Sequence, residues 1–188
     1  MTTYTYDAKS GRMTQAAQAR DGKELAKVSY THNAAGQLEK IDRGNGAVST
    51  YTFNDAGLPT GEKHTAPGGK AIAQHAYTHT PQRQLATDLA TVREKDGSEK
   101  KTATTHTYDT ENRLTRTRVT EGHTPGQGTL VSQSDYAFDL ASNLSEAKTT
   151  TRAADGTEKT SVTAYEHDSA SRTTHITEDG QKKAQTYD

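Results

Sequence analysis

The chain has 188 residues and carries 23 basic and 24 acidic side chains, which gives a formal net charge of -1. A balance this even indicates neither a nucleic-acid footprint nor attraction to an anionic membrane. The absence of cysteine excludes disulfides and thiolate chemistry. No apolar run approaches the roughly 18 residues of a membrane-spanning helix, and the N-terminus, MTTYTYDAKS, lacks the basic and apolar regions of a signal peptide.

The composition is poor in aliphatic residues and rich in strand formers. Leu, Ile, Val and Phe together make up 20 of 188 residues, below the share of an ordinary packed core. Disordered chains usually combine such low hydrophobicity with a high net charge, which this chain lacks. Its 33 Thr and 9 Tyr residues favour β-strands. We therefore expect an all-β chain whose sheet has at least one wet face.

A nine-residue motif recurs along the chain and organises it. Each copy has two ring side chains two residues apart, usually followed by Asp or Asn and then a turn. Of the 19 aromatic and histidine residues, 15 occupy these two ring positions, a sorting that chance does not produce. Seven copies begin at Tyr4, Tyr30, Tyr51, Tyr77, His106, Tyr136 and Tyr165, and a truncated eighth begins at Gln185. We expect residues 1–188 to form a single repeat array.

Each motif predicts the end of one strand and a tight turn. Rings two residues apart lie on the same face of a strand. The residue after the second ring, here called the Asp position, can hydrogen-bond the backbone two residues on. The Gly three residues later tolerates a positive φ, and the first copy inserts one residue between Asp7 and Gly11. This Gly position holds other residues in copies four to seven, and Arg83 fits a positive φ least well. The four residues are Arg83, Asn112, Ser142 and Ser171.

The segments between motifs predict return strands and a second set of turns. Alternating stretches such as residues 113–120 are typical of strands with Thr on one face. Residues 85–95 lack an apolar stripe wide enough for a helix, so we expect strand and loop there, and residues 121–129 indicate a longer loop. Two-residue hairpin turns are predicted at Asp21-Gly22, Asp96-Gly97, Asp155-Gly156 and Asp179-Gly180.

Two sets of residues could suggest a chemical site, but structural roles explain both. Four ring positions hold His32, His79, His106 and His167. No metal-ligand spacing with an acidic partner accompanies them, so we expect ring-shaped strand residues in place of Tyr or Phe. Several histidines on one face could still loosen the sheet near pH 6, since protonation would place like charges side by side.

The aspartates of the motifs are the second set, and a catalytic or calcium-binding role is conceivable for them. They are Asp7, Asp109, Asp139 and Asp168. One carboxylate per repeat is the wrong arrangement for a paired-carboxylate site, and turn formation explains each of them. No nucleophile elbow, Ser-His-Asp set or phosphate loop is recognisable. We therefore expect no enzyme activity and no catalytic, cofactor-binding or metal-binding residues.

The motifs resemble the Rhs/YD-repeat family, whose consensus is roughly Y-x-Y-D-x-x-G-R-L. The two best copies are HTYDTENRL, from His106, and YTYDAKSGRM, from Tyr4. Departures are Thr80 at the Asp position, Leu58 at the position of the consensus Arg (the Arg position), and Pro59 at the position of the consensus Leu. In that family, which includes bacterial Rhs polymorphic toxins, Tc toxin shell subunits and teneurins, the repeats form a β-strip that spirals into a hollow shell. The resemblance thus implies tandem β-hairpins in a curved strip, an arc of a hollow β-shell.

The same resemblance implies a function for the chain. We expect a non-catalytic structural scaffold, part of a shell that encapsulates and sequesters the C-terminal toxin of a secreted Rhs-type protein. Its partners would be the remaining repeats of the parent shell and the toxin payload, with no nucleic acid and no membrane insertion by this segment. Because the sequence stops within a motif at Tyr187-Asp188, we expect a fragment of a larger protein.

Two further expectations remain open from the sequence. Exposed strand edges could pair with another copy of the chain, so self-association is possible. The alternative function is a cell-surface adhesion or recognition module that binds carbohydrate or protein through aromatic or loop residues. Regular aromatic rows are more often structural, which favours the scaffold.

Overall fold

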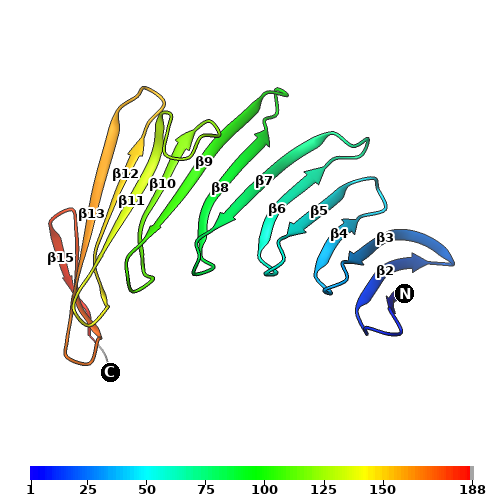
Figure 1. The fold of residues 1–188 in the computed structure, drawn as a ribbon, viewed down its shortest axis with the longest axis horizontal. Coiled ribbons are helices and arrows are strands. Elements are labelled where there is room, and N and C mark those ends of the chain that lie inside the picture. The colour runs from blue at the N-terminus through cyan, green and yellow to red at the C-terminus, as the bar shows by residue number, and fades with distance from the viewer. Residues whose placement is uncertain (187–188) are drawn as a thin grey trace. The chain divides into compact units, whose positions relative to one another are not determined.

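The computed structural model describes residues 1–186, and its regular elements are β-strands (Figure 1). Within this range the strands are β1 (Thr2–Tyr6), β2 (Met13–Arg20), β3 (Lys23–His32), β4 (Leu38–Asp42), β5 (Val48–Phe53), β6 (Pro59–Thr65), β7 (Ala71–His79), β8 (Leu85–Arg93), β9 (Glu99–Tyr108), β10 (Leu114–Glu121), β11 (Leu130–Phe138), β12 (Leu144–Arg152), β13 (Glu158–His167), β14 (Thr173–Glu178) and β15 (Gln181–Ala184). The all-β prediction is confirmed. The ring and Asp positions of the truncated eighth motif, at 187 and 188, lie outside the described residues.

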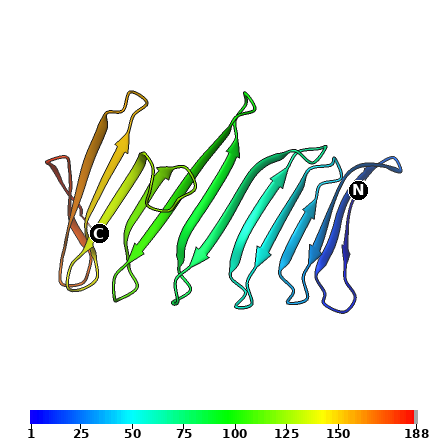
Figure 2. The same ribbon diagram turned by 45° about the horizontal axis from the view of Figure 1, so that its top comes forward.

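The chain divides into two units, each containing an antiparallel meander, and the division runs through β8 and β9. Unit 1 consists of residues 1–79 and 90–101, and unit 2 consists of residues 80–89 and the chain from 102 onward. In unit 1, the strands from β1 to β7 pair consecutively, ending with β6 and β7. In unit 2, β9 to β15 do the same. Within each unit the motif turns lie at one end of the strands, and the connecting turns lie at the opposite end (Figures 1 and 2).

Six of the seven motif turns are three-residue hairpin loops closed by backbone hydrogen bonds, and the loop of copy one is one residue longer, with the amide of Asp7 donating to the carbonyl of Arg12. In copy two, the amide of Asn33 donates to the carbonyl of Gln37 (2.9 Å), and the amide of Gly36 donates to the carbonyl of Asn33 (2.8 Å). This is a type I turn followed by a residue of positive φ, a loop in which Gly is the favoured third residue. The Gly position has a positive φ in all seven copies, including the poorly suited Arg83 at 68°. The sequence prediction for this position is confirmed.

In most copies, the strand that follows the motif turn contains a β-bulge opposite the second ring position. In β1 and β2, Thr5 pairs with Gln15 while Tyr6 pairs with Met13, which leaves Thr14 as the extra residue. The hydroxyl of Thr14 donates to the carbonyl of Thr5 (3.3 Å). Thr115 and Thr174 make the equivalent hydrogen bond, to the carbonyls of Thr107 and Glu166 (3.1 Å each). A threonine at this position therefore adds a side-chain hydrogen bond across the ladder beside the bulge.

The connecting turns confirm only half of the predicted two-residue hairpins. Asp21-Gly22 and Asp179-Gly180 have positive φ at both residues, as a type I′ turn requires. At the other two sites the prediction is wrong, because Asp96-Gly97 and Asp155-Gly156 belong to three-residue loops, closed by Glu94–Ser98 and Ala153–Thr157. There a hydroxyl residue follows the Gly, and Oδ1 of the Asp accepts hydrogen bonds from its amide and its hydroxyl. These bonds stabilise a type I turn instead.

The remaining elements follow the sequence prediction. Few side chains in the described residues are buried. Residues 85–93 form strand β8, and residues 122–129 form the loop between β10 and β11. Among the described residues, those that are buried are small: Ser49, Ala90, Ala103 and Thr120. The ring positions of copies two to seven are half-buried, whereas the residue between the two rings is exposed. Within residues 1–186, no helix is long and apolar enough to cross a membrane.

Candidate functional site

The side chain at the Asp position is engaged in its own turn, and copy five shows this most completely. Oδ1 of Asp109 accepts hydrogen bonds from the backbone amides of Glu111 (3.0 Å) and Arg113 (2.9 Å). Oδ2 accepts a hydrogen bond from Nε of Arg113 (2.7 Å). The Asp position thus caps the turn, and the Arg position holds the carboxylate from the other side.

The same arrangement recurs with different side chains. Asp168 and Arg172 repeat the pairing of copy five. Asp139 accepts from the amide and Nδ2 of Asn143. In copy two, Asn33 accepts from the amide of Gln37 (2.9 Å), and its Nδ2 donates to Oε1 of Gln37 (3.0 Å). In copy four, even Thr80 serves, since its Oγ1 accepts from the amide of Gln84.

These hydrogen bonds lower the pKa of the turn aspartates. For Asp109 and Asp168 the amide at the Arg position is the largest cause; the guanidinium hydrogen bond also lowers the pKa, and partial desolvation opposes the shift. For Asp139 the side chain of Asn143 is the largest cause, and for Asp7 it is the hydroxyl of Ser10. A general acid needs a raised pKa, so these groups are poorly suited to donate a proton near neutrality.

The four ring-position histidines lie on β3, β7, β9 and β13. Nδ1 of His106 lies 3.1 Å from the hydroxyl of Thr117, and burial lowers the pKa of His106, with Asp88 opposing the shift. Nδ1 of His167 lies 4.0 Å from Oδ2 of Asp139. Residues 1–186 contain no group of three or more His, Cys, Asp or Glu side chains placed to hold a metal ion.

The rings do not form one continuous stack, because a return strand separates consecutive motifs. Tyr30 pairs with Ile41, Tyr136 with Ala147, and Tyr165 with Ile176, so aliphatic side chains alternate with rings. Two histidines outside the motif join this face instead. His64 meets Tyr51 edge-on at 6.3 Å between centroids, and His75 stacks on Tyr77 at 5.9 Å.

A buried polar cluster in unit 1 contains the residue types of a catalytic set, but a substrate cannot reach its serine. Ser49 is fully buried, and its Oγ accepts from Nη1 of Arg43 (2.8 Å) and lies 2.8 Å from Nδ1 of His64. Nε2 of His64 lies 3.8 Å from Oε1 of Glu62. A nucleophile must reach its substrate, and the buried Ser49 cannot. Sequence reasoning missed this cluster because only the β5–β6 register, which pairs Ser49 with His64, brings its members together.

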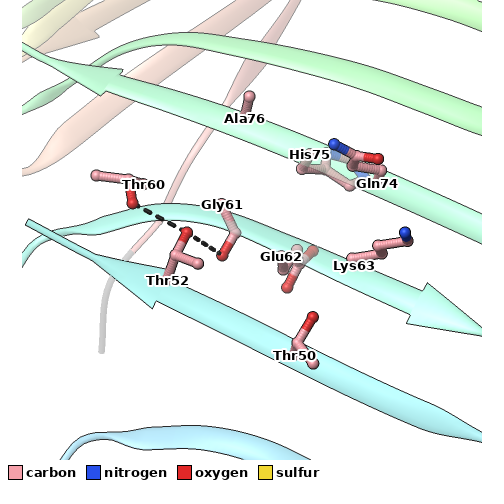
Figure 3. Close-up of a pocket in the computed structure, with 9 residues that line it drawn as sticks. All are labelled: Thr50, Thr52, Thr60, Gly61, Glu62, Lys63, Gln74, His75 and Ala76. Carbon is pink, nitrogen blue, oxygen red and sulfur yellow. Dashed lines mark hydrogen bonds between the residues drawn. The ribbon is translucent and has the colours of Figure 1, made fainter. Parts of the chain in front are cut away.

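The face opposite the rings of unit 1 has a shallow hollow of about 280 Å³ (Figure 3). It lies over Gly61, where a Cβ would approach the carbonyl of His75 to 2.9 Å. Thr60 donates to Thr52 (3.0 Å), and Thr52 donates to the carbonyl of Gly61 (3.4 Å). The hydroxyls at its floor therefore bond one another and the backbone, and they do not converge on a common point.

Comparison with known proteins gives likenesses among solved structures. No family model matches the chain, and no curated protein matches it. The chain is similar to the crystal structure of TcdB2-TccC3-Cdc42, with 14% identity, a TM-score of 0.48, and 91% of this chain and 11% of that chain covered. It is similar to the Photorhabdus luminescens Tc holotoxin pore with the mutation TccC3-D651A, with 13% identity, a TM-score of 0.43, and coverage of 93% and 12%.

A porin-like protein from Bacteroides uniformis is a third likeness, with 14% identity, a TM-score of 0.43, and 97% of this chain and 86% of that chain covered. The chain thus spans between 11% and 14% of the length of the toxin chains that it matches first.

Proposed function

We propose that the chain is a non-catalytic scaffold of YD repeats, part of a shell that encapsulates and sequesters the C-terminal toxin of a secreted Rhs-type protein. The observation that carries this proposal is the capped turn, whose Gly position has a positive φ in seven copies. The motif aspartates serve as hydrogen-bond acceptors inside these turns. Because these carboxylates stabilise turns, their role in this proposal is structural.

The face opposite the rings fits the inner wall of such a shell. Five of the seven motifs place an exposed threonine between the two rings, and neighbouring residues project alternately from the two faces of a strand. These residues are Thr5, Thr31, Thr52, Thr78 and Thr107. A hydroxyl-rich, wet surface presents little apolar area to a partly folded payload. It would enclose that payload without binding it strongly.

The partners in this proposal are the other repeats of the parent shell and the payload. The repeats of residues 1–188 would then continue one array, and the parent protein would be delivered outside the cell that makes it. The alternative is a surface adhesion module that binds carbohydrate or protein. Tyr4 and Tyr6 favour that alternative most, because they are 57% and 59% exposed on β1.

Protease protection in the full-length product of the gene tests the scaffold proposal. We expect the polypeptide encoded after residue 188 to resist a nonspecific protease in the native protein. It should become sensitive when the turns of copies five and seven are opened by Asp109→Ala and Asp168→Ala. The matched control is Asp21→Ala, in a connecting turn. Equal cleavage in the native and turn-opened proteins contradicts encapsulation, and glycan binding that is lost in Tyr4→Ala/Tyr6→Ala supports adhesion instead.

A further inference from the structure

The side chain at the Arg position has a second contact, outside its own turn. Nε2 of Gln37, in copy two, donates to the carbonyl of Gly57 in copy three (2.9 Å). In unit 2, Nε2 of Gln84 donates to the carbonyl of Asn112 in the next copy (2.7 Å). Each contact joins a motif turn to the following motif turn, 20 or 28 residues further along the chain.

Arginine makes the same connection with its guanidinium. Nη1 of Arg113 donates to Oγ of Ser142, in the next turn of unit 2 (2.9 Å). In unit 1, the guanidinium of Arg12 occupies the space where a Cβ of Gly36 would lie. In all four cases the contacted residue stands at the Gly position of the next motif, where φ is positive.

Gln37 and Arg113 each form one hydrogen bond within their own turn and another to the next turn. Oε1 of Gln37 accepts from Nδ2 of Asn33 in its own turn (3.0 Å), while its Nε2 reaches the next turn. Arg113 divides its donors in the same way, with Nε on Asp109 and Nη1 on Ser142. A side chain with only one hydrogen-bonding atom cannot make both contacts.

Length explains which residues make the contact. Successive motif strands are two strand spacings apart, roughly 9–10 Å, so only a long side chain spans the gap between their turns. Asn143 is one methylene shorter than Gln, and its Nδ2 donates within its own turn, to Asp139 (3.0 Å). Leu58 has no hydrogen-bonding group.

We infer that the Arg position is the coupling position of the repeat: a Gln or Arg there links the opening of one hairpin to the opening of the next. Where the position holds Leu58 or Asn143, the following hairpin opens without that link. The stability of neighbouring hairpins is therefore set by one residue per repeat, in addition to the strand ladder that repeat proteins share. This inference does not depend on what the shell encloses.

Gln37→Glu separates the two roles, because Glu keeps the acceptor for Asn33 and replaces the donor that faces Gly57. The readout is amide hydrogen exchange at Asn54, Gly57 and Leu58, whose amides close the next turn. Loss of one such hydrogen bond should accelerate their exchange about tenfold. The amides of Gly36 and Gln37, in the substituted turn, should keep their rates. Gln18→Glu, at an exposed site of β2, is the charge-matched control.

A second measurement in unit 2 keeps the inference testable if Gln37→Glu does not fold. In a double-mutant cycle, Arg113→Ala and Ser142→Ala should be less destabilising together than the sum of the two. Arg113→Ala paired with Ser171→Ala, which changes the same position one motif later, should be additive. Faster exchange confined to the substituted turn, or additivity in both cycles, overturns the inference.

Discussion

Asp109 and Arg113 bind each other twice across a single turn, through the Arg113 amide on Oδ1 (2.9 Å) and through its Nε on Oδ2 (2.7 Å). The pair fixes both oxygens of the carboxylate in the charged form. In the related turns, Asn33 and Asn54 supply the amide acceptor without a charge. Natural copies of the motif therefore include both titrating and non-titrating caps.

The titrating caps predict a loss of stability in acid. The pKa values of Asp109, Asp139 and Asp168 are lowered in the folded state, chiefly by hydrogen bonds from the Arg position. A lowered carboxyl pKa contributes stability above the unfolded value of about 3.9, and that contribution is lost as the pH falls through the folded value. We expect the Tm of the native protein to decrease as the pH is lowered below about 4.

Replacing these three residues with Asn should flatten that acid limb, since Asn keeps Oδ1 as an acceptor and does not titrate. Circular dichroism melts at pH 7 and pH 3 make the comparison. An Asn variant whose Tm falls as steeply as that of the native protein would show that other groups control acid stability.

Arg83 predicts a stabilising substitution. It is a non-glycine residue at a φ of 68°, a conformation that costs an ordinary side chain about 1–2 kcal/mol. Gly relieves that cost and loses part of the gain to the entropy of the unfolded chain. We expect Arg83→Gly to raise stability by about 1 kcal/mol, or Tm by about 2–4 °C.

Arg83→Ala is the matched control for this prediction, since it removes the same side chain and keeps the strained φ. It should not raise the Tm. An equal gain in both variants would mean that the arginine side chain, and not the backbone, is the source of the cost.

His106 predicts a second pH dependence, nearer neutrality. Burial lowers its pKa in the folded state, so the unfolded chain takes up the proton more readily. Stability is then complete above the unfolded value of about 6.5 and decreases as the pH falls below it. His106→Tyr, which installs the residue found at this ring position in the other six copies, should reduce the Tm difference between pH 7.5 and pH 5. An unchanged difference would show that the burial of His106 does not control stability in this pH range.

Short-range chemistry explains why much of the fold could be predicted from the sequence. A turn such as that of Asn33 to Gln37 is determined by residues within five positions of each other, so its positive φ at Gly36 could be predicted from the motif alone. Even Arg83 adopts the predicted φ, because the surrounding hairpin outweighs its preference.

Features that depend on strand register could not be predicted in this way. Ser49 meets His64 only because β5 and β6 pair as they do. The return strands, which vary between copies, decide that Ile41 and Ala147 stand between the rings. The second contact of Gln37 lies 20 residues away and needs the spacing of two strands, which no local pattern reveals.

Strand β1 predicts concentration-dependent self-association. It is the edge strand of unit 1, all five of its residues are exposed, and its side chains carry no charge. An uncharged exposed edge is a template for pairing with another chain, and lysine on such an edge opposes it. We expect light scattering to show oligomers of the native chain at high concentration, and Thr3→Lys/Thr5→Lys to shift them toward monomer with little change in Tm.

The control for the edge places the same two charges away from it. Thr31→Lys/Thr52→Lys alters exposed residues of β3 and β5, which are paired on both sides, and gives the same net charge. If pairing through β1 drives association, this variant should associate as the native chain does. Equal suppression by both variants would make net charge the cause, and a native chain that remains monomeric at every concentration would mean that β1 is protected against pairing.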